Sequence, residues 1–299
     1  MSWTPADLLR PAAPASVHDF DGWRGALLAL ESSGPFALAV LGGRRAGSVG
    51  WAFGFGYQAA LRAMFPRQMH SRVGALCATE AGGNHPRAIR TKLHDGVLTG
   101  EKSFVTLGPL ADQLVVVASE GTHPSGHNML VGCVVDPRQP GVAMSPMPAL
   151  PFVPELAHGT MRLTGAVPTE VVDGDGYTGL LKPFRTVEDI HVHAAVAAWL
   201  LGVAVESGWP EPLVESLLMV VAGLATSAET HPLSPGAHRL LGGALSAFTA
   251  VVAEAEPHIA AGPSTIAEMW ARDRPLLRVA SSARQARLHR AREHFRSVP

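Results

Sequence analysis

Residues 98–118 read LTGEKSFVTLGPLADQLVVVA, two runs rich in Val, Leu and Thr that are separated by a Gly-Pro break. Short apolar runs between turn residues are typical of β-strands. The same texture extends from about residue 73 to about residue 172, and Asp95-Gly96 predicts a hairpin turn because this dipeptide tolerates positive φ angles. The pattern predicts a sheet domain with strands at Ile89–Leu93, Leu98–Val105, Gln113–Ser119, Met129–Val135 and Thr160–Leu163.

Helical patterns lie on both sides of this block. Trp23–Ser32 and Gly54–Met64 have the spacing of short helices between Pro and Gly breaks. Four longer segments follow residue 176, and four helices with short connections predict a bundle: Val187–Val205, Glu211–Thr230, Gly236–Ala255 and Ser264–Phe295. We therefore expect an α+β multidomain protein with an N-terminal helical domain at 1–72, a middle antiparallel β-domain at 73–175 and a C-terminal four-helix bundle at 176–299.

Composition excludes several classes of protein. Hydrophobic residues make up 47% of the 299 residues and charged residues 16%, which is too apolar for intrinsic disorder. The net charge of -1 argues against a nucleic-acid partner. The longest apolar stretch, Ala194–Val205, is shorter than the roughly 20 residues that cross a bilayer, so we expect no membrane partner. The N-terminus lacks a signal-peptide pattern and the chain has two cysteines, Cys77 and Cys133, which predicts a cytoplasmic protein.

Two short motifs resemble ligand sites, but each has a plainer explanation. The segment 54–59, GFGYQA, matches a dinucleotide-binding pattern, yet no strand precedes it. We interpret it as a small-residue helix that packs closely on a neighbour. His191-Val192-His193 places two histidines on different faces of a helix and suggests no third ligand, so we expect no metal site.

The C-terminal segment Ala271–Arg296 is strongly basic. It carries eight arginines against one aspartate and one glutamate. Two interpretations stay open: a helix that holds phosphates, or a solvated basic face on a packed terminal helix. The apolar side that Leu277, Leu288 and Phe295 offer favours the second interpretation.

Several segments, in order along the chain, resemble the acyl-CoA dehydrogenase family. Thr79-Glu80 is similar to that family's Thr-Glu-Pro motif, and 98–108 with 111–118 is similar to its "G-x-K-x-[WF]-[IV]-[TS]-x-G…AD" series. Arg272-Asp273 and Arg292-Glu293-His294 match the frame of its last helix. The family's order of helical, sheet and four-helix domains is also the order predicted above. The chain therefore resembles a shortened, divergent member of that family.

This resemblance implies a flavoprotein that binds FAD and oxidises the α,β carbon–carbon bond of acyl-CoA or another acyl thioester. Such chemistry needs a carboxylate that takes the α-proton, donors for the thioester oxygen and a flavin against the β-carbon. Matched to the family, Thr79 and Thr106 are the hydroxyl donors to the flavin, Phe104 packs on it, and the backbone near Ala78 and Val105 lies along its edge. The threonines also suit ordinary strand positions.

The resemblance fails at the catalytic base. The family's two base positions fall on Ser281 and Val192, and neither side chain is an acid. The nearest carboxylates on the first bundle helix are Glu188 and Asp189, which are the candidates for a relocated base. Thr186-Val187-Glu188-Asp189 also has capping-box spacing, which favours a structural role for these acids at a helix N-terminus.

Three functions therefore stay open. The first is a flavin-dependent oxidoreductase acting on an acyl thioester with a relocated base. The second is a catalytically lapsed relative that keeps the fold as a binding or partner protein. The third keeps the flavin for oxygen chemistry, which needs no α-proton base. For the assembly, the family implies a homo-oligomer, and a lapsed relative is expected to pair with a full-length one.

Overall fold

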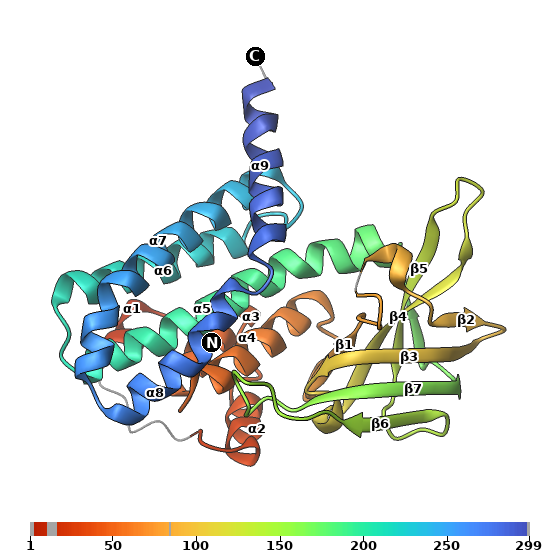
Figure 1. Cartoon of the computed structure of the whole chain (residues 1–299), viewed down its shortest axis with the longest axis horizontal. Coiled ribbons are helices and arrows are strands. Elements are labelled where there is room, and N and C mark those ends of the chain that lie inside the picture. The colour runs from red at the N-terminus through yellow and green to blue at the C-terminus, as the bar shows by residue number, and fades with distance from the viewer. Residues whose placement is uncertain (1–2, 11–16, 84, 298–299) are drawn as a thin grey trace. The chain divides into compact units, whose positions relative to one another are not determined.

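The computed structural model describes residues 3–10, 17–83 and 85–297. The chain forms two compact units, shown in Figure 1. The helical unit comprises residues 1–60, 150–155 and 186–299, and the sheet unit comprises residues 61–149 and 156–185. This grouping differs from three consecutive domains, because the N-terminal and C-terminal helices pack together in one unit.

The helices of the described residues follow the apolar segments of the sequence, several of them with earlier starts. Their bounds are α1 Pro5–Leu9, α2 Phe20–Ala29, α3 Pro35–Arg45, α4 Val49–Met64, α5 Lys182–Glu206, α6 Glu211–Ala228, α7 Pro235–Ala261, α8 Ser264–Asp273 and α9 Ser281–Ser297. Helices α1 and α3 are additional to the predicted ones. Proline is the first residue of α1, α3 and α7, where a missing amide N–H costs nothing.

Helix α5 is the centre of the helical unit, and every residue from 189 to 202 is buried. Glycines let two N-terminal helices approach its backbone. A Cβ on Gly43 of α3 would lie 2.2 Å from the Ala195 carbonyl oxygen, and one on Gly56 of α4 would lie 2.5 Å from Val192 Cα. The glycine motif at 54–59 is therefore a helix-packing motif, as predicted.

The predicted C-terminal helix Ser264–Phe295 is wrong as a single helix. Helix α8 ends at Asp273, a 3-10 helix follows at Arg274–Arg278, and α9 begins only at Ser281. Pro275 lacks the amide N–H that a continuing α-helix needs, and Ala280 has a left-handed φ of 61°. The basic segment is consequently divided between two helices that run in different directions (Figure 1).

The sheet unit contains eight strands within the described residues, in the order β6-β7-β3-β2-β4-β5-β8, with β1 beside β4. Their bounds are β1 Gly74–Cys77, β2 Lys92–His94, β3 Val97–Thr106, β4 Gln113–Thr122, β5 Asn128–Val135, β6 Val142–Pro146, β7 His158–Ala166 and β8 Glu170–Val172. The core of the unit is formed by the buried faces of β1, β3, β4, β5 and β7.

Most strand pairs are antiparallel, but the sheet is mixed, which corrects the predicted antiparallel domain. β1 pairs with β4 in parallel, and β2 also touches β4 in parallel. The predicted hairpin is confirmed: His94 faces Val97 across Asp95 and Gly96, whose φ angles are 49° and 76°. The strands that the sequence did not predict, β1, β6 and β8, have five residues or fewer.

Two helical stretches, Gly176–Glu206 and Glu211–Ala228, are long and apolar enough to cross a membrane by length and composition. The most apolar 18-residue window is 78% buried inside the protein in the first stretch and 39% buried in the second. A buried core helix of a globular protein meets the same criterion, so one or two such helices are weak evidence of membrane insertion.

Candidate functional site

The end of β1 lies beside a bulge in β3, and this junction holds the residues matched to a flavin site. The Ser103 amide donates a 2.9 Å hydrogen bond to the Thr79 carbonyl oxygen. The register of β3 against β7 shifts between Lys102 and Val105, which places Phe104 in the bulge. Thr79 and Phe104 are therefore brought to the same place by strands that are distant in sequence.

Phe104 has an unusual conformation for a large aromatic residue. Its φ is 52°, and its side chain is 55% exposed although the adjoining Lys102 and Val105 are buried. A bulky residue at positive φ is rare and strained, and it persists only where its surroundings hold it. The flanking buried residues hold the bulge, and the bulge presents an apolar ring to the surface.

Thr106 ends β3 and is half-buried opposite His158 of β7. It lies two residues beyond Phe104, on the far side of the bulge. Burial lowers the pKa of His158, whose Nδ1 lies 2.8 Å from the Leu156 carbonyl oxygen. Ala78 and Val105 are both buried, so only their backbone groups are suited to line a ligand.

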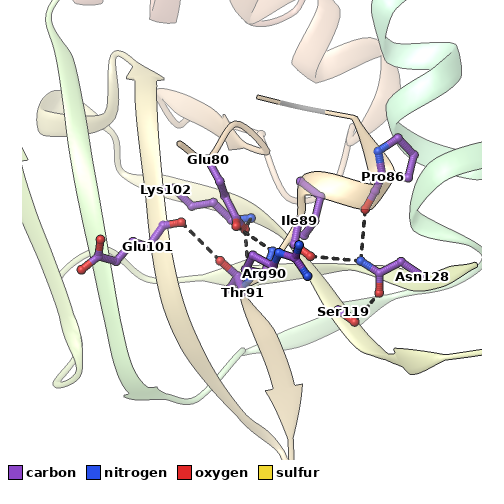
Figure 2. A network of polar contacts seen from close by, with 9 residues as sticks. All are labelled: Glu80, Pro86, Ile89, Arg90, Thr91, Glu101, Lys102, Ser119 and Asn128. Atoms are coloured by element: carbon purple, nitrogen blue, oxygen red, sulfur yellow. Dashed lines mark hydrogen bonds and ion pairs between the residues drawn. The ribbon is translucent and has the colours of Figure 1, made fainter. Parts of the chain in front are cut away.

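A buried ion pair fixes the segment that carries Thr79, as Figure 2 shows. Lys102 Nζ donates a 2.6 Å hydrogen bond to Glu80 Oε1, and these side chains are 0% and 7% exposed. The Arg90 and Thr91 amides donate to the same carboxylate at 2.6 Å and 3.0 Å. Glu80 therefore joins the end of β1, the bulged strand β3 and the segment that leads into β2.

The protonation of this pair follows from its surroundings. Burial raises the pKa of Glu80, but the hydrogen bond from Lys102, the Thr91 amide and the Lys102 charge outweigh it and lower the pKa overall. Burial lowers the pKa of Lys102, and Glu80 only partly offsets this effect. Because both side chains are enclosed by protein, the pair stabilises the structure beside the bulge and does not face a ligand.

One hydroxyl at this junction has no partner. Ser103 Oγ is buried and has no hydrogen-bond partner among the described residues. Buried polar groups are almost always paired, so this hydroxyl is able to accept a further partner. The junction thus presents the exposed Phe104 ring beside an unpaired hydroxyl.

The two candidate bases lie inside α5, not at its start. A turn of π-helix, Gly176–Leu181, precedes α5, and Asp175 caps it by accepting a 2.6 Å hydrogen bond from the Thr178 amide. The predicted capping box at 186–189 is therefore wrong, because the helix begins before it. The structural role expected for Glu188 and Asp189 at an N-terminus does not exist.

Asp189 instead pairs with two arginines of α9. Arg284 Nη1 lies 3.0 Å from Asp189 Oδ1, and Arg287 Nη2 donates to Asp189 Oδ2. Both carboxylate oxygens accept from a guanidinium, which makes Asp189 a poor proton acceptor. Glu188 is half-buried on the same helix.

The positions that the resemblance assigned to a base lie in different surroundings. Val192 is buried, and its backbone lies close to Gly56 of α4. Ser281 is exposed at the first turn of α9. No local sequence signal pointed to the pairing of Asp189 with Arg284 and Arg287, because the partners are more than 90 residues apart.

The histidine pair of α5 binds backbone groups. His191 Nδ1 lies 2.7 Å from the Val187 carbonyl oxygen, and His193 Nδ1 lies 2.7 Å from the Asp189 carbonyl oxygen. Burial lowers the pKa of His191 to about 4 and also lowers the pKa of His193. In the part of the chain that the structure describes, no group of three or more His, Cys, Asp or Glu side chains is arranged for a metal ion.

Comparisons with known proteins identify a fold and no sequence family. No family model matches the chain, and no curated protein matches it. Among solved structures, a probable acyl-CoA dehydrogenase from Mycobacterium abscessus is 17% identical, with a TM-score of 0.66 over 92% of this chain and 91% of that chain. The prolyl acyl carrier protein oxidase AnaB is 15% identical, with a TM-score of 0.63 over 92% and 91% of the two chains.

A third structure, PigA with FAD and proline, is 13% identical, with a TM-score of 0.54 over 80% of each chain. At these identities the likeness shows the fold alone. It confirms the acyl-CoA dehydrogenase-like fold that the ordered motifs predicted, with its helical, sheet and helical segments.

Proposed function

From the acyl-CoA dehydrogenase-like fold that this chain adopts, we propose that it is a flavin-dependent oxidoreductase that oxidises the α,β carbon–carbon bond of an acyl thioester. The observation that carries the proposal is Phe104, an exposed aromatic ring held at positive φ in a buried bulge. Strain of this kind clusters at functional sites. The orphaned Ser103 hydroxyl at the same bulge supports a ligand there.

FAD is the cofactor that we propose, and when bound it supplies the acceptor for the hydride that leaves the β-carbon. Phe104 provides a stacking surface, and the hydroxyls of Thr79 and Thr106 and the backbone near Ala78 and Val105 provide hydrogen bonds. The Glu80–Lys102 pair keeps the Thr79 segment in register with β3. A preorganised edge of this kind lowers the cost of ordering a ligand.

Glu188 is the proton acceptor that we propose for the α-carbon. Asp189 is the weaker candidate, because two guanidiniums occupy its oxygens. A Glu188→Gln variant is expected to retain FAD and lose exchange of the substrate α-proton with solvent deuterium. An Asp189→Asn variant that folds is expected to keep this exchange. The opposite result would assign the proton transfer to Asp189.

The neighbours suggest two carriers for the thioester. One is described as a probable acyl-CoA dehydrogenase and another as an acyl carrier protein oxidase. We propose an acyl thioester as the substrate, and bleaching of bound flavin under anaerobic conditions by an acyl-CoA or by an acyl carrier protein thioester would identify the carrier.

Flavin binding is the first test. The purified protein, supplied with FAD, is expected to show flavin absorbance that remains after gel filtration. A Phe104→Ala variant is expected to bind FAD about tenfold more weakly, since an aromatic contact contributes roughly 0.5–1.5 kcal/mol beyond the buried area. Phe295→Ala is the matched control, because Phe295 is 52% exposed on α9 in the helical unit. If the protein takes up no flavin, the proposal is wrong.

The second candidate is a relative that keeps the fold without catalysis. It is favoured by the absence of an acid at both base positions, Ser281 and Val192, and by the pairing of Asp189 with arginines. This candidate predicts that FAD binds, if at all, without bleaching by any thioester. A cytoplasmic location and assembly as a homo-oligomer, or pairing with a full-length relative, stay predictions.

A further inference from the structure

A cavity of about 870 Å³ lies within the helical unit and is lined by α7 and by the segment from the end of α8 to α9. This segment includes the 3-10 helix Arg274–Arg278, and the left-handed Ala280 follows it before α9 begins. Helices α7 and α9 lie close together further on, where a Cβ on Gly242 would lie 2.7 Å from Leu288. The volume falls within the roughly 300–1,000 Å³ of small-molecule sites.

The wall of this cavity is rich in arginine, and most of these side chains are already paired. Four arginines line it, Arg274, Arg278, Arg284 and Arg287. Arg274 pairs with Glu256, and Arg284 and Arg287 pair with Asp189. Arg278 is exposed at the cavity, and it forms no ion pair with any of the residues that the structure describes. A lone guanidinium in a concave wall is a strong recognition group for a carboxylate or a phosphate.

The floor of the cavity is apolar and neutral. Leu241 and Phe248 of α7 are buried there, and His193 of α5 lies beside Phe248. His193 Nδ1 donates to the Asp189 carbonyl oxygen, and burial lowers the pKa of the ring, so the ring is neutral at neutral pH. The cavity thus has cations at its mouth and apolar side chains at its base.

Ser281 lies in the wall at the mouth, close in sequence to Arg278. This is the position at which the resemblance placed a glutamate. A carboxylate there would put a negative charge on the same wall as the free guanidinium, whereas a serine hydroxyl can donate a hydrogen bond to an anion. Serine at this position therefore leaves the wall without a negative charge that would repel an anion.

We propose that this cavity binds an amphipathic organic anion, with its carboxylate or phosphate at Arg278 and Ser281 and its aliphatic chain against Leu241 and Phe248. None of the residues proposed to hold FAD lines the cavity. The site is independent of the proposed redox activity and is expected to bind its ligand whether or not flavin is present.

Isothermal titration of the full chain tests the site with two probes, decanoate and decyl phosphate, each below its micelle concentration. Decanol has the same alkyl chain without a charge and tests whether binding needs the anionic group. Inorganic phosphate has no alkyl chain and tests whether binding needs the aliphatic part of the ligand. One or both anionic probes are expected to bind with one site per chain, and the tighter of the two identifies a carboxylate or a phosphate ligand. Equal binding of decanol, or equal binding of inorganic phosphate, would overturn the proposal.

Variants at the mouth locate the site. Arg278→Gln is expected to weaken binding of the anionic probe about tenfold, the effect of one lost charge-assisted hydrogen bond. Ser281→Glu is expected to weaken it by about tenfold or more through charge repulsion. Both residues are exposed, so both variants are expected to keep the wild-type circular dichroism and Tm.

Arg290→Gln is the matched control, because Arg290 is an exposed arginine on α9, the helix that begins at Ser281, and does not line the cavity. This variant is expected to bind the probe as the wild type does. If Arg278→Gln and Ser281→Glu bind as tightly as the control, the ligand lies elsewhere and the proposal is wrong.

Discussion

Each unit of the protein contains a carboxylate that pairs with cations from a distant segment, and the two arrangements, at Glu80 and at Asp189, differ in burial and in the sequence separation of the partners. Glu80 and Lys102 lie 22 residues apart in the sheet unit and are almost completely enclosed. Asp189 meets Arg284 and Arg287, which lie 95 and 98 residues away, and all three side chains keep 11–14% exposure. The enclosed Glu80–Lys102 pair joins neighbouring segments of the sheet. The more accessible cluster at Asp189 joins the central helix α5 to the terminal helix α9.

The difference has an energetic consequence. Removing one member of a fully buried pair leaves a charge that water cannot reach, and such losses cost about 3–5 kcal/mol. Where the ions keep some access to solvent, water takes over part of the lost interaction. We therefore expect the sheet pair to be more sensitive to substitution than the helical cluster.

The largest effect is expected for Lys102→Met. It leaves Glu80 buried without its ammonium partner and is expected to lower the free energy of unfolding by about 3–5 kcal/mol, measured by urea denaturation. Lys92→Met is the matched control, because Lys92 is exposed in the same unit. A Glu80→Gln/Lys102→Met double variant is expected to recover part of the loss, since no charge is left unpaired. A loss no larger than that of the control would contradict the buried-pair interpretation.

The second largest effect concerns the pH dependence of stability in the helical unit. It arises because α5 buries neutral histidines close to Asp189. Burial lowers the pKa of His191 to about 4 from its ordinary value of 6.5. As the pH is lowered below about 6.5, His191 takes up a proton in the unfolded chain but stays neutral in the folded chain until about pH 4. The free energy of unfolding therefore decreases as the pH is lowered through this window, and His191 accounts for about 3 kcal/mol of that decrease at pH 4.

A His191→Gln variant is expected to show a shallower fall in the free energy of unfolding between pH 6.5 and pH 4. His193, whose pKa burial also lowers, continues to contribute to the remaining slope. The measurement is a series of urea denaturations across this pH range. An unchanged slope in the variant would show that His191 takes up its proton in the folded state as readily as in the unfolded state.

The smallest of the three effects is expected for Asp189→Asn. The amide keeps the shape of the side chain but loses two charge-assisted contacts, which is expected to cost about 2 kcal/mol in the free energy of unfolding. Glu293→Gln, an exposed change on α9, serves as the control. A cost for Asp189→Asn above that for Lys102→Met would reverse the comparison between the two clusters.

Local sequence patterns predicted much of the secondary structure, for reasons that are themselves local. The Asp95-Gly96 turn and the long apolar strands were predicted because φ preferences and apolar runs act over a few residues. The capping box at 186–189 was a wrong prediction of the same kind. The spacing was correct, but the chain had already entered helix through the cap at Asp175.

The prediction of a single C-terminal helix was wrong for a related reason, because it too considered only the local spacing of apolar residues. Helical spacing continues through residues 264–295, but Pro275 and the left-handed Ala280 interrupt it. The proline was present in the sequence and could have predicted the break. The direction that α9 takes afterwards, and hence the cavity beside α7, depends on its packing against Gly242 and on its arginines binding Asp189.

The sequence by itself determined the order of helical, sheet and helical segments, the hairpin at residues 95–96 and the absence of an acid at both family base positions. Only the tertiary structure decided that Phe104 is exposed at a strained bulge, that Asp189 is occupied by two arginines and that a cation-lined cavity lies beside α7. The first set depends on side-chain chemistry within short windows. The second depends on which distant segments share a buried space, which hydrophobic packing and ion pairing select only when the whole chain is folded.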